Sequence, residues 1–176
     1  SILDISAIES GGGGLDRETF NALEALNECI HIFSADAARK DISLSVDADA
    51  GVVDINADRQ AIRQVILNLL SNALKFTPPG GKIDASAYEV ADAVIIKMVD
   101  TGCGIAQGNL PGITEPFARG DLDPYKAVEG WGLGLAICKT LIEKHGGRIE
   151  IESTVGQGTT VSVILPKLVW EQKQRA

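Results

Sequence analysis

The sequence predicts an α+β fold in which helices and mostly antiparallel strands form two layers. Three observations lead to this expectation. Apolar residues recur at helical spacing in several segments, alternating strand-like stretches lie between them, and the last two strands are joined by a glycine-containing turn. The chain has 176 residues, which is enough for one domain with a hydrophobic core.

The first half of the chain predicts the end of one helix, two further helices and two strands. Residues 2–9 place isoleucines at helical spacing, and the glycines at 11–14 indicate a linker. A helix is predicted over 21–40, followed by strands over 42–46 and 51–56. Asp58 is suited to cap the next helix. The apolar stripe of that helix consists of Ile62, Val65, Ile66, Leu69 and Ala73.

The second half predicts four strands, a long loop region and one helix. Strands are expected over 82–89 and 94–99. Residues 100–132 contain glycines but little periodicity, and a loop of this length inside a compact domain is usually functional or mobile. A helix is predicted over 133–145, where two glycines end it. The segments "RIEIES" and "TTVSVILP" alternate on either side of "TVGQG", which predicts a hairpin.

The overall charge and the cysteine content narrow the classes of function. The formal net charge is −8, which argues against a nucleic-acid-binding protein, because such proteins usually carry a basic face. The 3 cysteines are odd in number and show no CxxC spacing, so reduced thiols in a cytosolic setting are the simple interpretation. No apolar run reaches the ~18 residues that a membrane span needs.

The segment "NLLSNALKFT", residues 68–77, carries a polar face beside the apolar stripe of its helix. On a wheel of about 100° per residue, this face holds Asn68, Asn72, Lys75 and Phe76. Asparagine is unfavourable inside a helix, so two of them on one face suggest a purpose. An amide oxygen can bind Mg²⁺, a lysine can neutralise phosphate, and an aromatic ring can cover a base. A solvated polar edge is the alternative.

Three glycine-containing segments complete the candidate motifs. In "VDTGCGI", residues 99–105, the aspartate can accept a hydrogen bond from an amine such as that of adenine, and the alternative is a surface turn. In "GWGLGLA", residues 130–136, glycines precede a helix N-terminus, which suggests an anion site, and the alternative is a flexible turn and cap. By itself, "GQGTT", residues 156–160, predicts only a hairpin turn.

Together these segments resemble the ATP-binding catalytic domain of bacterial sensor histidine kinases, in the GHKL superfamily. "NLLSNALKFT" is similar to the N box of this family, "DTGCGI" to its G1 box, "EPFARGD" to its F box, "GWGLGLA" to its G2 box and "GQGT" to its final glycine motif. The resemblance spans roughly residues 16–166. It implies a two-layer α/β sandwich of the Bergerat type, with a mostly antiparallel sheet covered by helices on one face.

The resemblance implies that ATP and Mg²⁺ are the ligands, and it gives roles to single residues. Asn72 would bind Mg²⁺, and Asp100 would accept from the adenine amino group. Asn68 stands where ATP-hydrolysing relatives carry a general-base glutamate, and an amide cannot take a proton from water, which favours phosphoryl transfer over hydrolysis. Asn68, Lys75 and Arg119 are the catalytic candidates. The further nucleotide contacts implied are Phe76, Gly102, Gly104, Ile105, Phe117, Tyr125, Lys126, Gly132, Leu133, Gly134 and Thr159, of which Tyr125 and Lys126 belong to a flexible ATP lid.

Two positions depart from the family pattern. Thr114 stands where the F box usually begins with an aromatic residue, and Trp131 stands where the G2 box usually has Thr or Ser. The indole of Trp131 would either narrow the site or stiffen the lid. A degenerate nucleotide-binding scaffold with weak or no phosphotransfer is therefore an alternative to an active kinase. A hydrolysing relative of the gyrase or chaperone kind is disfavoured by Asn68.

The resemblance places the phosphoacceptor histidine on an upstream dimerisation domain. Neither His31 nor His145 has the family's phosphoacceptor context, so both are expected to be structural, with His145 as a partly positive ring at a helix C-terminus. The expected partners are that upstream domain, a response regulator or phosphotransfer protein, and a second copy in a full-length homodimer. No nucleic acid is expected.

The expected domain organisation has three parts. Residues 1–14 would be the end of an upstream dimerisation helix with its glycine linker, 15–167 the ATP-binding catalytic domain, and 168–176 a C-terminal tail. The domain itself is expected in the cytoplasm, and a membrane anchor elsewhere in the full-length protein stays open.

Overall fold

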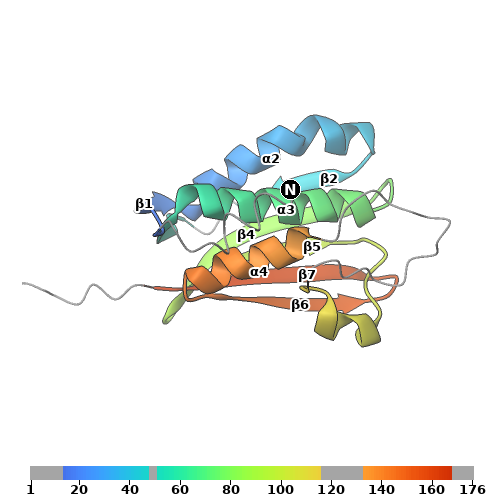
Figure 1. Cartoon of the computed structure of the whole chain (residues 1–176). Coiled ribbons are helices and arrows are strands. Elements are labelled where there is room, and N and C mark those ends of the chain that lie inside the picture. The colour runs from blue at the N-terminus through green and yellow to red at the C-terminus, as the bar shows by residue number, and fades with distance from the viewer. Residues whose placement is uncertain (1–13, 48–50, 116–132, 168–176) are drawn as a thin grey trace, which may run out of the picture.

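The main sheet has five strands and is covered by helices on one face (Figure 1). The structure is a computed structural model that describes residues 14–47, 51–115 and 133–167. Neighbouring strands are antiparallel, apart from the first pair, which is parallel. The predicted fold class is therefore confirmed. In spatial order the strands are β2 (Ser43–Val46), β4 (Lys82–Val90), β5 (Ala93–Asp100), β7 (Gly158–Pro166) and β6 (Arg148–Thr154).

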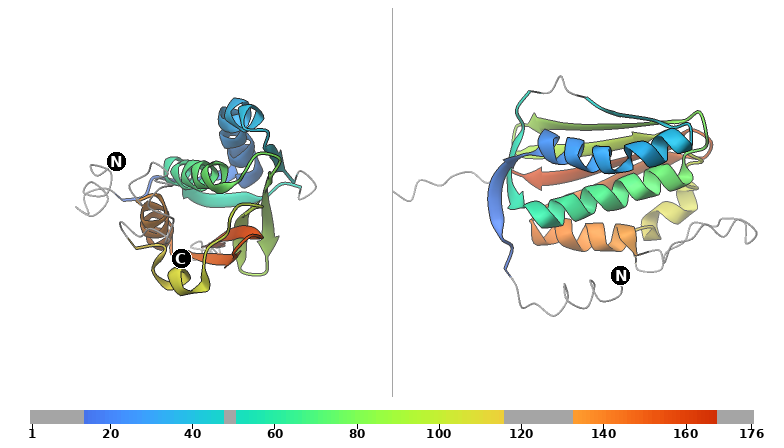
Figure 2. Two further views of the ribbon diagram at one scale, coloured as in Figure 1. Left: turned by 90° about the vertical axis from the view of Figure 1, so that its right-hand side faces the viewer. Right: turned by 90° about the horizontal axis from the view of Figure 1, so that it is seen from above.

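Three helices lie side by side on the sheet, α2 (Ala22–Arg39), α3 (Arg59–Phe76) and α4 (Gly134–Lys144). Seen from above, α3 lies between the other two and packs against both (Figure 2). The predicted apolar stripe of α3 is buried in the core, and Leu70 and Leu74 join it. The opposite wall of the core includes Ile83, Ile96 and Val163 from the sheet. Because α3 has α2 on one side and α4 on the other, side chains on its two sides face different neighbours.

The ends of α3 follow the predicted signals. Oδ1 of Asp58 accepts the backbone N–H of Ala61 at 3.0 Å, which satisfies one of the free amides of the first turn. The helix stops at Phe76, and Thr77 follows in an extended conformation before two prolines. The predicted cap and the predicted stop are both present.

The sequence predicted only one of the two strands of a small second sheet. β1 (Arg17–Asn21) pairs antiparallel with β3 (Asp54–Asp58), so that Phe20 faces Ile55 across the pair and both are buried. The sequence predicts no strand at 17–21, because only Phe20 there is buried and no apolar alternation marks the segment. The strand expected at 51–56 lies slightly later in the chain. Pairing with a distant segment, rather than a local pattern, therefore forms this sheet.

The environment of His145 corrects the expectation of a partly positive ring. The side chain is 3% exposed, its Nδ1 donates to the carbonyl oxygen of Leu141 at 2.7 Å, and its Nε2 accepts the N–H of Asp58 at 3.0 Å. A ring that accepts a hydrogen bond at Nε2 is neutral and carries its proton on Nδ1. The imidazole joins the end of α4 to the start of α3.

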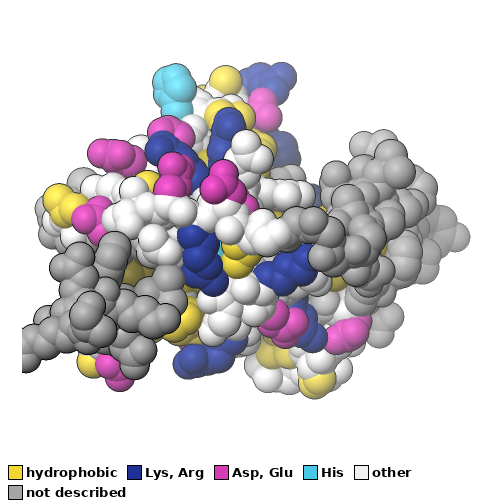
Figure 3. All heavy atoms as spheres, turned by 60° about the vertical axis from the view of Figure 1, so that its left-hand side comes forward, with side chains coloured by type: hydrophobic (Ala, Val, Ile, Leu, Met, Phe, Trp, Pro, Cys, Tyr) yellow, Lys and Arg dark blue, Asp and Glu magenta, His cyan; other side chains and the backbone are white. Residues whose placement is uncertain are grey.

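In the described part of the region after β5, residues 101–115, there is one short helix, η1 (Gln107–Gly112), where the sequence predicts only loop. The expected ATP lid, the F-box residues Phe117 and Arg119, and Trp131 lie outside the described residues, as do the upstream helix end and the C-terminal tail. Among the helices that the structure describes, none combines the length and apolar composition needed to cross a membrane. On the face drawn in Figure 3, basic and acidic side chains lie interspersed.

Candidate functional site

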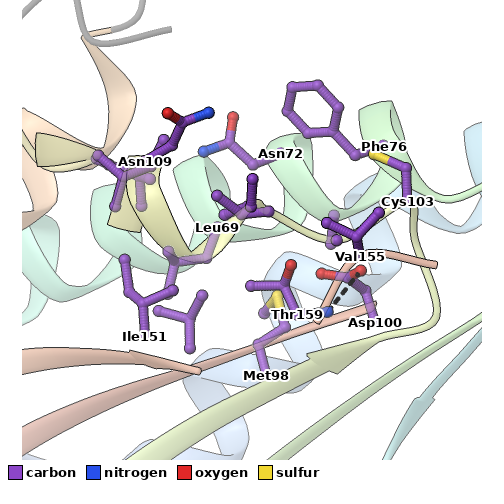
Figure 4. A pocket seen from close by; sticks show the side chains of 17 residues that line it. Leu69, Asn72, Phe76, Met98, Asp100, Cys103, Asn109, Ile151, Val155 and Thr159 are labelled. Carbon is purple, nitrogen blue, oxygen red and sulfur yellow. Dashed lines mark hydrogen bonds between the residues drawn. The ribbon is translucent and has the colours of Figure 1, made fainter. Parts of the chain in front are cut away.

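A cavity of about 420 Å³ lies between α3 and the sheet, next to η1 and the first turn of α4 (Figure 4). Pockets that bury a small organic ligand typically enclose roughly 300–1,000 Å³. Among the described residues that line the cavity, most are apolar, and the polar side chains are few: Asn72, Asp100, Asn109 and Thr159. The apolar wall includes Leu69, Met98, Ile105, Leu135, Ile151 and Val161. A flat, largely apolar ring with a few polar edges matches this lining.

Asp100 is the acidic side chain of the cavity, at the end of β5. Its Oδ1 accepts two backbone N–H groups, from Gly102 at 2.8 Å and from Thr159 at 3.3 Å. Burial raises the pKa of this carboxyl above its ordinary value, while the two hydrogen bonds act in the opposite direction. Its Oδ2 makes no hydrogen bond within the part of the chain that the structure describes. That oxygen is available to accept a hydrogen bond from a ligand.

Glycines let the loop after β5 lie directly against the turn between β6 and β7. Gly104 and Gly158 both have positive φ, and a Cβ at either would overlap a backbone carbonyl oxygen, that of Thr154 and that of Asp100 respectively. Two hydrogen bonds stabilise this contact. The N–H of Gly156 donates to the carbonyl oxygen of Cys103 at 2.8 Å, and the N–H of Ile105 donates to Oγ of Ser153 at 2.8 Å. Only glycine fits at these two positions without displacing the backbone.

The polar face of α3 divides between three environments, which differs from the single face expected. Asn72 and Phe76 line the cavity. Asn68 does not line it, and its Nδ2 donates to the carbonyl oxygen of Gly134 at 3.4 Å, so it contacts the first turn of α4. Lys75 lies 5.1 Å above the centre of the Phe76 ring and lines a second cavity of about 470 Å³ between α2 and α3. The second cavity is lined by Phe33, Asp36, Arg39, Lys40, Ser71, Leu74 and Lys75.

The N-terminus of α4 lies at the Asn72 edge of the cavity. A Cβ placed at Gly134 would come 3.8 Å from Nδ2 of Asn72. The N-cap residue of α4 is Leu133, whose side chain cannot accept a hydrogen bond from the first amides of the helix. Such a helix end favours an anion. Leu133 itself is 6% exposed and belongs to the hydrophobic core.

The structure brings together most of the predicted nucleotide contacts that it describes. These cavity residues are Asn72, Phe76, Asp100, Gly104, Ile105 and Thr159. Gly102 does not line the cavity but lies against two residues that do, since a Cβ there would come 2.7 Å from the carbonyl oxygen of Phe76 and 2.6 Å from Oδ1 of Asp100. The candidates outside the described residues are Phe117, Arg119, Tyr125, Lys126 and Gly132. The roles of all these residues stay predictions.

Several cavity residues were missed by sequence reasoning. Met98, Ile151 and Val161 belong to predicted strands, where alternation shows that they face one side but not that a cavity lies there. Cys103 and Asn109 follow Asp100 in the loop region, and no local pattern distinguishes them. The remaining lining residues that were missed as such are Leu69, Ala73, Ala106, Ile113, Leu135 and Val155.

Comparison with known proteins identifies the family. Residues 57–169 match the family described as "Histidine kinase-, DNA gyrase B-, and HSP90-like ATPase". An uncharacterized sensor-like histidine kinase of Rhizobium meliloti is 37% identical over 166 residues, which are 94% of this chain and 32% of the relative. The histidine protein kinase DivJ of Caulobacter vibrioides is 37% identical over 168 residues, 96% of this chain and 28% of the relative. The chain thus spans about a third or less of these relatives.

Solved structures agree with the sequence match. Full-length ShkA in complex with AMPPNP is 26% identical with a TM-score of 0.83, over 94% of this chain and 34% of that one. Histidine kinase ThkA, in complex with the response regulator protein TrrA, is 26% identical with a TM-score of 0.77, over 94% of this chain and 46% of that one. The chain therefore belongs to the histidine kinase-, DNA gyrase B- and HSP90-like ATPase family, within which it is a catalytic domain of the histidine kinase type.

Proposed function

We propose that the cavity binds ATP with the adenine amino group donating to Asp100, and that the γ-phosphoryl group passes to a histidine of an upstream dimerisation domain. The observation that supports this best is the carboxylate of Asp100 inside an otherwise apolar cavity of ligand size. An exocyclic amine can donate to its Oδ2, while Oδ1 remains held by the backbone. The bound nucleotide of ShkA, AMPPNP, supports the same ligand class.

The donor groups beside the cavity fit Mg²⁺ held together with phosphates. Asn72 offers an amide oxygen, a hard ligand that suits this cation. Mg²⁺ usually keeps several waters and needs only one or two protein ligands when substrate phosphates supply the others. The described residues hold no group of three acidic, histidine or cysteine side chains that would form a separate cage. When bound, the cation would neutralise charge on the phosphates.

The position of Asn68 favours transfer of the phosphoryl group over hydrolysis. Its amide donates to Gly134 at the start of α4, beside the edge where the phosphates are proposed to lie. An amide cannot accept a proton from an attacking water at neutral pH. Asn68 would therefore orient the first turn of α4 without activating water. We propose that Arg119 contacts the phosphates, and that Lys75 does so after turning from the second cavity, which it lines in this structure. We propose the same for Tyr125 and Lys126 toward the ribose or phosphates.

The proposal extends to partners and organisation. The upstream dimerisation domain would end within residues 1–14, the catalytic domain would span 15–167, and 168–176 would be a tail. The phosphorylated histidine would supply a response regulator or phosphotransfer protein, as the ThkA–TrrA complex suggests by analogy. The full-length protein would act as a homodimer, with this domain in the cytoplasm.

The first test is calorimetric titration of the 176-residue chain with ATP in magnesium. Asp100→Asn and Asn72→Ala should each weaken binding by about tenfold or more, because each removes a hydrogen bond or metal ligand at a buried site. Ser71→Ala is the matched control, since Ser71 is exposed on the same helix and lines the other cavity. Absence of saturable binding by the unaltered chain would contradict the proposal.

The second test separates a kinase from a scaffold. The full-length protein should be incubated with labelled ATP, and we expect label on a histidine upstream of this chain. Label that forms only after Trp131→Thr would instead support a scaffold whose indole closes the site.

A further inference from the structure

We infer that Asn109 is a further nucleotide-contact residue, whose side-chain NH₂ donates a hydrogen bond to the ribose or phosphates of the bound nucleotide. The inference rests on the proposed ATP site. It adds a second carboxamide, contributed by η1, to the one that Asn72 contributes from α3.

Hydrogen bonds to one residue of β6 hold η1 in place. The side chain of Gln107 donates through Nε2 to the carbonyl oxygen of Ser153 at 2.8 Å. The N–H of Ile105, just before η1, donates to Oγ of the same Ser153 at 2.8 Å. Within η1, the N–H of Asn109 donates to the carbonyl oxygen of Ala106 at 2.9 Å. The backbone that carries Asn109 is therefore fixed to the sheet, so its side chain is presented to the cavity from a defined position.

The side-chain amide of Asn109 has hydrogen-bonding capacity that none of the described residues uses. Asn109 is half-buried and lines the cavity, yet its side chain makes no hydrogen bond to any residue that the structure describes. An asparagine amide carries two N–H donors and one acceptor oxygen. A polar side chain in a largely apolar wall gains most when a ligand satisfies those groups.

The place of Asn109 indicates which part of the nucleotide it meets. Figure 4 shows the amides of Asn109 and Asn72 at the same edge of the cavity, with Asp100 and Thr159 at the other side. The Asn72 edge adjoins Gly134 and the N-terminus of α4, which favours an anion. With the adenine amino group at Asp100, the ribose and phosphates extend toward the two amides. These parts of the ligand carry many acceptor oxygens, which suit an NH₂ donor.

The experiment compares ATP, ADP and adenosine on the 176-residue chain, with adenosine measured by displacement of a fluorescent ATP analogue. For Asn109→Ala we expect the ATP and ADP affinities to fall about tenfold, the loss typical of one hydrogen bond to a charged group, with a much smaller change for adenosine. Asn109→Asp should weaken ATP and ADP further, because a carboxylate cannot donate and repels phosphate. Gly108→Ala is the control, since a Cβ there meets nothing within 4 Å.

Three outcomes would overturn the inference. The first is wild-type affinity of Asn109→Ala for all three ligands. The second is an equal loss for all three, which would mean that Asn109 acts only on the shape of the cavity. The third is unchanged or tighter ATP binding by Asn109→Asp in magnesium, which would mean that the amide oxygen faces the cation. Failure of the unaltered chain to bind any of the ligands would instead contradict the proposed ATP site itself.

Discussion

Oδ1 of Asp100, at the end of β5, accepts the backbone N–H of Thr159 on the neighbouring strand β7, at 3.3 Å. The sheet itself therefore orients the carboxylate that the proposed adenine contact needs. Burial disfavours the charged form of this carboxyl and raises its pKa, whereas the backbone hydrogen bonds that orient it favour the charged form.

Nucleotide binding should weaken on acidification, because Oδ1 of Asp100 already accepts two N–H groups and protonation would place the proton on Oδ2, which then accepts the adenine amino group poorly. Burial raises the pKa of Asp100 above its ordinary value of 3.8, so protonation begins at a higher pH than for an exposed aspartate. Affinity should be full above the raised pKa and fall as the pH is lowered through it. Displacement by adenosine over a pH series measures this without titrating phosphate. The same midpoint in Asp100→Asn would show that another group is responsible.

The closely packed glycines should tolerate no side chain. Gly158→Ala would place a Cβ against the carbonyl oxygen of Asp100 at a positive φ, and we expect a loss of about 3 kcal/mol or more in the free energy of unfolding. Gly156→Ala is the matched control on the same turn, because it shares a positive φ but meets nothing within 4 Å. Its cost should be about 1 kcal/mol. Urea unfolding of both variants gives the comparison, and equal costs would contradict the role of the close contact.

The three cysteines should differ sharply in reactivity. Cys103 is exposed and lines the cavity, whereas Cys29 and Cys138 are buried. Burial raises the pKa of the Cys138 thiol to about 12, so almost none of it is thiolate at neutral pH. A thiol reagent should modify one group per folded chain rapidly and the others only in denaturant.

ATP should protect the reactive thiol if the nucleotide occupies the cavity. Mass spectrometry should find the rapidly attached label on Cys103. Cys103→Ser should abolish the rapid reaction. Rapid modification that ATP leaves unchanged would place the nucleotide elsewhere.

Removal of the His145 side chain should destabilise the fold although it lies outside the cavity. His145→Ala leaves the N–H of Asp58 and the carbonyl oxygen of Leu141 without their partner, and we expect a loss of about 2–4 kcal/mol in unfolding free energy. His31→Ala is the control, because His31 is exposed on α2 and should change stability by less than about 0.5 kcal/mol. Equal effects in thermal melts would contradict the bridge between α3 and α4.

Local patterns predicted most of the elements that define the fold. The stripe and cap of α3, the β6–β7 hairpin and the order of helices and strands follow from spacing and turn residues that neighbours in sequence supply. β1 could not be predicted, because its strand conformation depends on pairing with β3 more than thirty residues later. The neutral ring of His145 depends in the same way on a distant backbone N–H.

The sequence motifs anticipated that Asp100 and Asn72 would lie at one cavity, while their roles there stay predictions. Lys75 shows the limit of the helical wheel, because its side chain lines the cavity between α2 and α3 and not the one that Asn72 lines. Asn109 shows another limit. Its place at the cavity depends on the hydrogen bonds of Gln107 and Ile105 to Ser153, which only the folded chain brings together.

The glycine contacts behind Asp100 also bear on how this domain could be inhibited. At Gly102, Gly104 and Gly158 any side chain would collide with neighbouring atoms that include main-chain carbonyl oxygens, so these positions cannot be enlarged without disturbing the fold. A compound that took its contacts from this stretch of backbone would meet a surface that point mutations can hardly reshape. Resistance to such a compound would have to arise from more distant, replaceable side chains such as Val155 or Ile113 at the cavity wall.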